Sequence, residues 1–183
     1  MKSILCILIC LSLLPGFSCK HHSKKDSQIN PAWLKLTLPN EWTIYTPPGF
    51  ICKTMRGVDS NPGLIISNKD SIVLEFDSGP SEFNYKNCDL SYTYQMAKAS
   101  IDTGFYKTFY KVPQTHRANI DTIDDKIAVI VKPNPTGKGT TGIEILGCGH
   151  QPWIAITGKN LSAKKEKLVL EMYQTIRQSN PEQ

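Results

Sequence analysis

The chain has 183 residues, of which 40% are hydrophobic and 20% are charged, and its formal net charge is +5. This composition is typical of a globular protein and excludes a disordered or collagen-like chain. The basic residues form no dense stripe along the sequence, so we expect no nucleic-acid partner.

The first 18 residues have the three parts of a secretory signal peptide. Lys2 supplies a positive charge, the uncharged run from Ile4 to Leu14 follows, and Ser18 is a small residue before the expected cut. The apolar run is too short for a stable transmembrane helix, which needs about 20 residues. Cleavage after Ser18 leaves 165 residues and a net charge of +4, because Lys2 is removed. That length is enough for one domain with its own core.

Cys19 follows directly, at the position where bacterial lipoproteins carry a lipid-modified cysteine. The preceding residues, Leu14 to Ser18, resemble a loose lipobox, with Gly16 where a leucine is usual three residues before the cysteine. We therefore expect lipidation (palmitate) at Cys19 and a domain on the extracytoplasmic side of the inner or outer membrane of a bacterial cell envelope. The alternative is a soluble secreted protein in which Cys19 is an ordinary thiol.

Residues 19–31 are polar, lack periodicity and are interpreted as a flexible tether. A single domain is expected over residues 32–178, with a disordered tail at 179–183. Alternating apolar residues indicate β-strands over most of the domain. We predict strands at Leu34–Leu38, Trp42–Ile44, Phe50–Met55, Leu64–Ile66, Ser71–Phe76, Phe105–Val112, His116–Ile123, Ile127–Val131, Thr141–Leu146 and Pro152–Thr157.

Several of these predictions include more detail. In the strand Ser71–Phe76, the residues Ile72, Leu74 and Phe76 share one face, which we expect to be buried, while Glu75 and Asp77 share the wetter face with Val73. We expect the strand to end at Asp77–Pro80.

Asp124 and Asp125 predict a tight turn. The five apolar residues of Ile127–Val131 indicate a central strand that is covered on both faces.

Two helices are predicted. Leu90, Tyr94, Ala97 and Ile101 fall at i, i+4, i+7 and i+11, which is the spacing of one helix face. Alternation over residues 92–96 leaves a strand open there. The second helix closes the chain, with Ser162 as its cap. Its apolar stripe consists of Leu161, Leu168, Val169, Met172, Tyr173 and Ile176.

The fold class that follows is α+β: a mainly antiparallel β-sheet of about six to eight strands, with the C-terminal helix and the middle helix packed on it. Two stretches resemble a group of small uncharacterised bacterial lipoproteins with a PsbP-like domain. One runs from Gly57 through Gly63–Ile66 to Val73–Gly79, and the other from Lys132–Gly139 to the helix that ends near Arg177. The resemblance covers residues 33–178 and implies an antiparallel sheet with helices on its faces. It consists of core and turn positions and implies no catalytic residue.

Three patterns with possible chemistry have ordinary structural explanations. Gly137-Lys138-Gly139 lacks the G-x-x-x-x-G-K-[ST] spacing of a phosphate loop and precedes a strand, not a helix. Cys148 and His150 are two residues apart on a turn and have no evident orienting partner. The aspartates at 121, 124 and 125 lack the EF-hand spacing for calcium. We therefore predict no metal site, no cofactor and no catalytic residue.

Cysteine usage predicts one disulfide. If Cys19 carries lipid, then Cys52, Cys88 and Cys148 remain in an oxidising compartment, so one disulfide and one buried thiol are expected. Cys88 and Cys148 lie in a loop and a turn, where they can meet at a sheet edge. Our hypothesis is that they pair and that Cys52, in a strand, stays reduced.

The middle of the chain is rich in aromatic residues. Tyr92, Tyr106 and Tyr110 are the candidates for a binding surface, although aromatic residues also pack in cores. We predict a lipid-anchored cell-envelope protein that acts in binding or assembly, with the membrane and an envelope protein as partners. The alternatives are an envelope hydrolase with an unrecognised site and a soluble secreted effector. The absence of a catalytic motif favours a protein that is not an enzyme.

Overall fold

The computed structural model describes residues 29–80, 90–102, 116–147 and 151–179. Within these ranges the chain has the predicted α+β architecture, with two antiparallel sheets and two helices. The elements are β1 (Leu34–Thr37), β2 (Trp42–Thr46), β3 (Phe50–Thr54), β4 (Gly63–Ser67), β5 (Ile72–Gly79), α1 (Leu90–Asp102), β6 (Arg117–Ile123), β7 (Lys126–Lys132), β8 (Thr140–Ile145), β9 (Trp153–Lys159), α3 (Ala163–Tyr173) and β10 (Arg177–Gln178).

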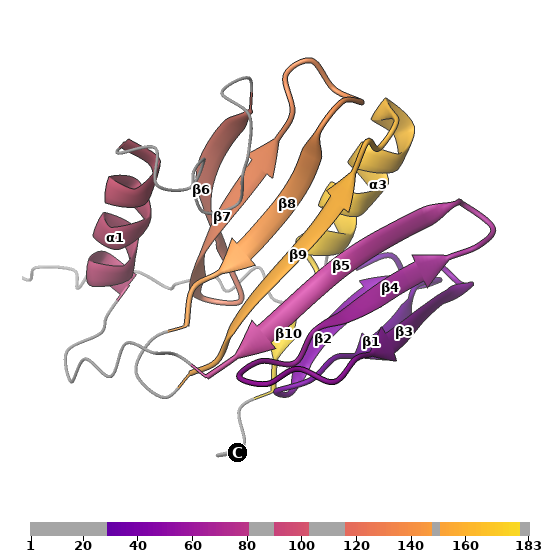
Figure 1. Cartoon of the computed structure of the whole chain (residues 1–183), viewed down its shortest axis with the longest axis horizontal. Helices are drawn as coiled ribbons and strands as arrows, with labels where there is room; N and C mark the ends of the chain where they lie inside the picture. Colours follow the sequence, from indigo (N-terminus) through magenta and orange to yellow (C-terminus); the bar gives the residue numbers. More distant parts are fainter. Residues whose placement is uncertain (1–28, 81–89, 103–115, 148–150, 180–183) are drawn as a thin grey trace, which may run out of the picture.

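The larger sheet has seven strands in the order β3-β4-β5-β9-β8-β7-β6, and the smaller one has three in the order β1-β2-β10. Figure 1 shows the larger sheet in front, with α3 and the smaller sheet behind it and α1 beside β6 and β7. No helix among the described residues is long and apolar enough to cross a bilayer.

The main core lies between the larger sheet and the layer formed by α3 and the smaller sheet. Ile72, Leu74 and Phe76 of β5 point into it and are at most 4% exposed, as the alternation predicts. Trp42 and Ile44 contribute from β2 and are fully buried. Each large aliphatic side chain that is buried in this way contributes about 1.5–3 kcal/mol as an upper bound.

The helix α3 closes the core. Val169, Met172 and Tyr173 are fully buried, and Leu168 is half-buried against the same cluster. The predicted stripe is therefore confirmed, although Ile176 lies beyond the end of the helix. Ser162 occupies the N-cap position but makes no side-chain capping hydrogen bond.

The helix α1 packs on the opposite face of the larger sheet, against β7 and β6. Ala97 is 1% exposed and joins Ile127, Val129 and Val131 in a second, smaller core cluster. The predicted helix is confirmed, but its buried stripe differs from the predicted one. Leu90 and Tyr94 are 52% and 44% exposed, because the sheet contacts the side of the helix on which Thr93 and Ala97 lie.

The sheet differs from the sequence prediction at three places. Strand β5 extends beyond Phe76, the end of the predicted strand, to Gly79, because Asp77, Ser78 and Gly79 pair with β9. Strand β7 is covered on both faces as predicted, yet it is the second strand from the edge. Strand β10 was not predicted, because two residues are too short for a periodic signal.

Candidate functional site

The exposed face of the larger sheet carries a short row of aliphatic side chains near its β3 edge. The strand register pairs Ile51 of β3 with Ile66 of β4, and Ile66 with Val73 of β5. Neighbouring strands lie about 4.8 Å apart, so these three side chains stand next to one another on one face. Ile51 and Val73 are 47% and 52% exposed, and Ile66 is half-buried. We call these three residues the apolar row.

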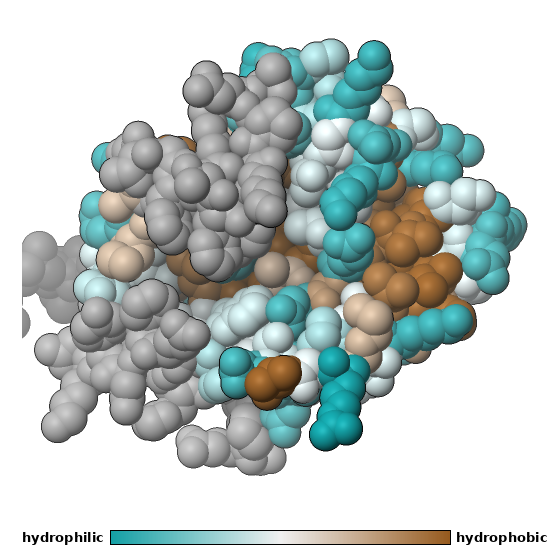
Figure 2. Space-filling model, viewed as in Figure 1, coloured by the Kyte–Doolittle hydropathy of each residue, from teal (hydrophilic) through white to brown (hydrophobic). Residues whose placement is uncertain are grey.

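The apolar row is part of a hydrophobic patch that is visible on the right of the molecule in Figure 2. Leu64 widens it, because it occupies the next cross-strand position on β4 and is half-buried. Removing apolar surface from water is favourable by about 25 cal/mol per Å². Contiguous exposed apolar patches on soluble domains mark interaction surfaces more often than isolated apolar residues do. The apolar row is thus a surface suited to an apolar partner.

Charged side chains border the apolar row unevenly. The carboxylate of Glu75 lies 3.3 Å from the Nζ atom of Lys159, and both side chains are more than half exposed. Such a pair is weak in water, but it balances the charge of Glu75. Lys53 is exposed and has no ion pair within the described residues. Lys53 is the charged residue of β3 and β4, so the border on the edge side is basic.

Sequence reasoning missed this surface. The alternation in β5 placed Val73 on the solvent face with Glu75, which is correct, but a single exposed valine is unremarkable. Only the pairing of three strands brings Val73 together with Ile66 and Ile51. The available signal was an apolar residue at an outward position in each of three neighbouring strands.

The predicted aromatic surface is described only in part. Tyr92 is half-buried on α1. Tyr106 and Tyr110 lie outside the described residues. Other apolar side chains of α1 are exposed, including Met96 at 43%. A binding surface at Tyr92, Tyr106 and Tyr110 stays a prediction.

Most of the predicted cysteine chemistry cannot be located, because Cys19, Cys88 and Cys148 lie outside the described residues. Cys52 is half-buried in β3, packs against the main core and has no disulfide partner within the described residues. Burial raises the pKa of the Cys52 thiol above its ordinary value. A protonated thiol of this kind is a poor nucleophile at neutral pH.

The aspartates near the β6–β7 turn have a structural role. One oxygen of Asp124 accepts the backbone N–H of Gln178 at 2.9 Å, and the other lies 3.8 Å from Nε of Arg177. Asp121 accepts a hydrogen bond from the side-chain amide of Gln174 at 3.1 Å. These carboxylates tie the C-terminal segment to the turn. No metal-binding group of three or more such side chains occurs among the described residues.

The glycine-rich loop between β7 and β8 uses its backbone N–H groups internally. The side chain of Asn160 accepts the N–H of Gly139 at 2.9 Å, and Nε2 of His116 accepts the N–H of Thr140 at 2.9 Å. A phosphate-binding loop would direct such N–H groups toward its ligand. This part of the loop is therefore a connection between two strands that hydrogen bonds to Asn160 and His116 hold in place.

The buried tyrosine of α3 also has a structural explanation. The hydroxyl group of Tyr173 donates a hydrogen bond to the backbone oxygen of Ile156 at 3.1 Å, and the oxygen of Thr141 is 3.4 Å away. Complete burial raises the pKa of Tyr173, so its hydroxyl stays protonated. The hydrogen bond satisfies a polar group that packing has removed from water.

No family model and no curated protein matches the chain. Among solved structures, a crystal structure from Bacteroides thetaiotaomicron VPI-5482 is similar to 81% of this chain, with a TM-score of 0.45 and 10% sequence identity. The chain spans 49% of the length of that protein. A similarity at this level carries no argument about function, and the resemblance to PsbP-like lipoproteins stays a prediction.

Proposed function

We propose that the protein is a lipid-anchored component of a bacterial cell envelope, and that its domain binds a protein partner through the apolar row. The anchor is supported by the signal-like N-terminus and by Cys19 directly after it. The binding role is supported by one observation above all, the exposed cross-strand contact of Ile51, Ile66 and Val73. A domain held near a membrane and exposing such a surface is suited to assembly with a neighbouring protein.

The anchor is tested by replacing Cys19 with serine. We expect the wild-type protein to fractionate with membranes and to carry the additional mass of a lipid, and the Cys19→Ser variant to be released. A variant that stays membrane-bound with the same strength would contradict the anchor.

The binding role is tested by site-specific cross-linking in cells. A photoreactive amino acid at Val73 should give a discrete cross-linked product, which the additional substitution Ile66→Asp should abolish. The matched control is the same amino acid at Glu171, an exposed position on α3. Equal products from both positions, or a product that is insensitive to Ile66→Asp, would rule out the apolar row as the binding surface.

A further inference from the structure

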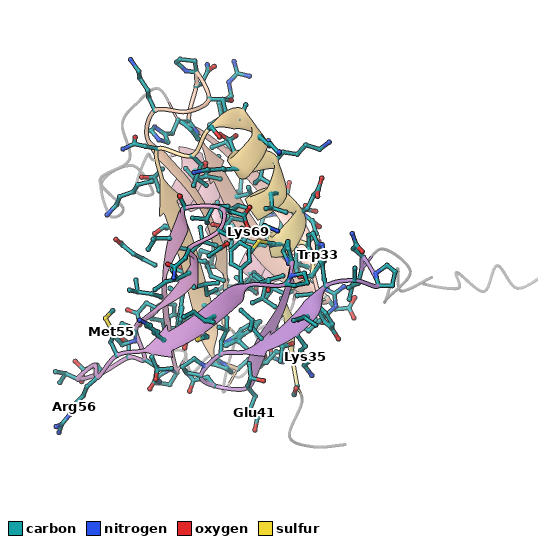
Figure 3. The ribbon with its side chains drawn as sticks, turned by 90° about the vertical axis from the view of Figure 1, so that its right-hand side faces the viewer. Trp33, Lys35, Glu41, Met55, Arg56 and Lys69 are labelled. Carbon is teal, nitrogen blue, oxygen red and sulfur yellow. The ribbon has the colours of Figure 1, made fainter. Side chains whose placement is uncertain are left out.

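The strand β3 is the last strand of the larger sheet, so within the described residues one of its two sides has no paired neighbour. Strand β1, one of the two edge strands of the smaller sheet, lies on the same side of the molecule. Figure 3 looks onto this side, with Met55 and Arg56 at one end and Trp33 and Lys35 at the other. Edge strands carry backbone groups that can pair with another chain.

The hydrogen-bond pattern identifies which backbone groups are free. The N–H of Met55 donates to the oxygen of Pro62 at 2.8 Å, which makes these two residues a hydrogen-bonded pair. Hydrogen-bonded and non-hydrogen-bonded pairs alternate along antiparallel strands. Lys53 and Ile51 therefore also bond to β4, and the N–H and C=O groups of Cys52 and Thr54 point away from it. No partner for these groups occurs within the described part of the chain.

The same edge leaves the main core thinly covered. Trp33 just before β1, Leu36 in β1 and Cys52 in β3 pack against the core and are only half-buried. An added strand next to β3 would extend the sheet over these side chains. It would therefore satisfy free backbone groups and bury apolar surface in a single contact, which is the basis of peptide recognition by strand addition.

The charge of the edge selects among possible strands. Lys53 points outward between the two free positions, and it is the charged residue of β3. A second copy of this chain that paired β3 antiparallel with β3, centred on Lys53, would pair the free groups of Cys52 with those of Thr54 and place the two Lys53 side chains directly opposite each other. Like charges across neighbouring strands are destabilising, whereas opposite charges are stabilising. The edge is thus unfavourable for self-pairing and favourable for an acidic strand.

We propose that the β3 edge takes an extended acidic segment of an envelope protein as an additional antiparallel strand of the larger sheet. This proposal rests on the binding function proposed above and names the mode of binding at the same surface. The residues of the added strand opposite Thr54 and Cys52 form the new backbone hydrogen bonds. The residue opposite Lys53 is acidic, and the one opposite Ile51 is apolar and extends the apolar row.

The probe is a synthetic peptide, acetyl-Ser-Thr-Glu-Val-Ile-Ser-amide, titrated into the full mature chain. Two control peptides accompany it: one has lysine in place of glutamate, and the other is N-methylated at threonine and valine, whose N–H groups face β3. We expect each control to bind at least about tenfold more weakly, which corresponds to about 1.4 kcal/mol.

Amide hydrogen exchange measured by NMR provides a readout that is specific to strand addition. Binding should slow exchange at Cys52 and Thr54, whereas Ile51 and Lys53 should change little because they already bond to β4. A partner that docks only on side chains would not produce this alternation.

Three variants separate backbone pairing from charge. Thr54→Pro removes a free N–H without removing any bond to β4 and should abolish binding of the glutamate peptide, whereas Thr54→Ala should bind within about twofold of the wild type. Lys53→Glu should reject the glutamate peptide and accept the lysine peptide. Thermal unfolding checks that each variant is folded. If Thr54→Pro does not fold, Lys53→Glu still tests the proposal.

The proposal is established if the glutamate peptide binds, if the amides of Cys52 and Thr54 are protected while those of Ile51 and Lys53 are not, and if Lys53→Glu reverses the preference for the glutamate peptide. Binding without that alternation, dimerisation that protects the same amides, or adsorption to phosphatidylglycerol vesicles without protection would each overturn it. If cross-linking at Val73 succeeds while the peptide fails, the binding function stands and strand addition is wrong. Failure of both experiments contradicts both proposals.

Discussion

The hydroxyl oxygen of Thr175 accepts a hydrogen bond from the backbone N–H of Tyr45 at 2.9 Å, across 130 positions of the sequence. The same hydroxyl group donates a hydrogen bond to the backbone oxygen of Met172, at 2.6 Å. Tyr45 belongs to β2, and Thr175 lies between α3 and β10, which pairs with β2. This side chain therefore joins the end of the closing helix to the smaller sheet.

We expect Thr175→Val to lower the free energy of unfolding by about 1–3 kcal/mol, because the substitution keeps the shape and leaves the N–H of Tyr45 without an acceptor. The control is Thr37→Val, at an exposed position on β1. Urea unfolding monitored by circular dichroism measures both variants. Equal midpoints for the two would show that the hydroxyl group of Thr175 does not stabilise the fold.

The packing of α3 is tested by Met172→Ala. Met172 is fully buried in the main core, and removing such a side chain typically costs about 2–5 kcal/mol. Lys164→Ala, at an exposed position on the same helix, should change stability by less than about 0.5 kcal/mol. A shift in melting temperature of similar size for both variants would contradict the assignment of the buried face.

The loop between β7 and β8 is tested at Gly139. Its φ angle is +125°, and a Cβ atom there would collide with the ring of His116. Gly49 also has a positive φ, +100°, but a Cβ atom there would meet open space. Gly139→Ala should therefore be more destabilising than Gly49→Ala by about 1–3 kcal/mol, the typical cost of overpacking. Chemical unfolding of the two variants gives this difference, and equal losses would mean that backbone strain alone decides the effect.

The thiol of Cys52 should react slowly in the native protein. Its pKa is raised above the ordinary value of 9.0 by burial, and the thiolate is the reactive form. The native chain thus keeps this proton to higher pH than the unfolded chain does. The free energy of unfolding is therefore unaffected by the ionisation of this thiol below about pH 9, and it decreases as the pH rises through the native pKa of Cys52. Iodoacetamide labelling at pH 8, quantified at Cys52 by peptide mass spectrometry, should be slower in buffer than in urea, and equal rates would contradict the burial.

A disulfide between Cys88 and Cys148 stays a prediction of the sequence. Peptide mapping without reduction should recover the two cysteine peptides as one linked species. Closing a loop of about 60 residues would stabilise the fold by roughly 4 kcal/mol in the chain-entropy model. A linked peptide that contains Cys52, or three free thiols, would show that the pairing is wrong.

The sequence predicted the strands and helices well where local signals are strong. The alternation of Ile72, Leu74 and Phe76 identified the buried face of β5, because side chains in a strand alternate between two faces. The spacing of Val169, Met172 and Tyr173 identified the buried stripe of α3 for the same kind of reason. The turn at Asp124 and Asp125 was also predictable, and both residues adopt the positive φ angles of a tight hairpin turn.

Local patterns were less informative where a neighbour decides the outcome. The spacing of Leu90, Tyr94, Ala97 and Ile101 indicated a helix but not the part of its surface that β7 would cover. Leu90 and Tyr94 are therefore exposed although they share the predicted stripe. The short strand β10 depends entirely on pairing with β2 and left no periodic trace in the sequence.

The sequence by itself determined the α+β class, the identity of most strands and the inward face of β5, because these follow from the period of apolar residues along one segment. Only the tertiary structure decided which strands are neighbours and which one lies at the edge. The apolar row depends on that decision, since Ile51, Ile66 and Val73 are far apart in sequence and meet through the register of β3, β4 and β5. The free N–H and C=O groups of Cys52 and Thr54 have the same origin, because a strand's position in the sheet, and not its composition, determines whether both of its sides are paired.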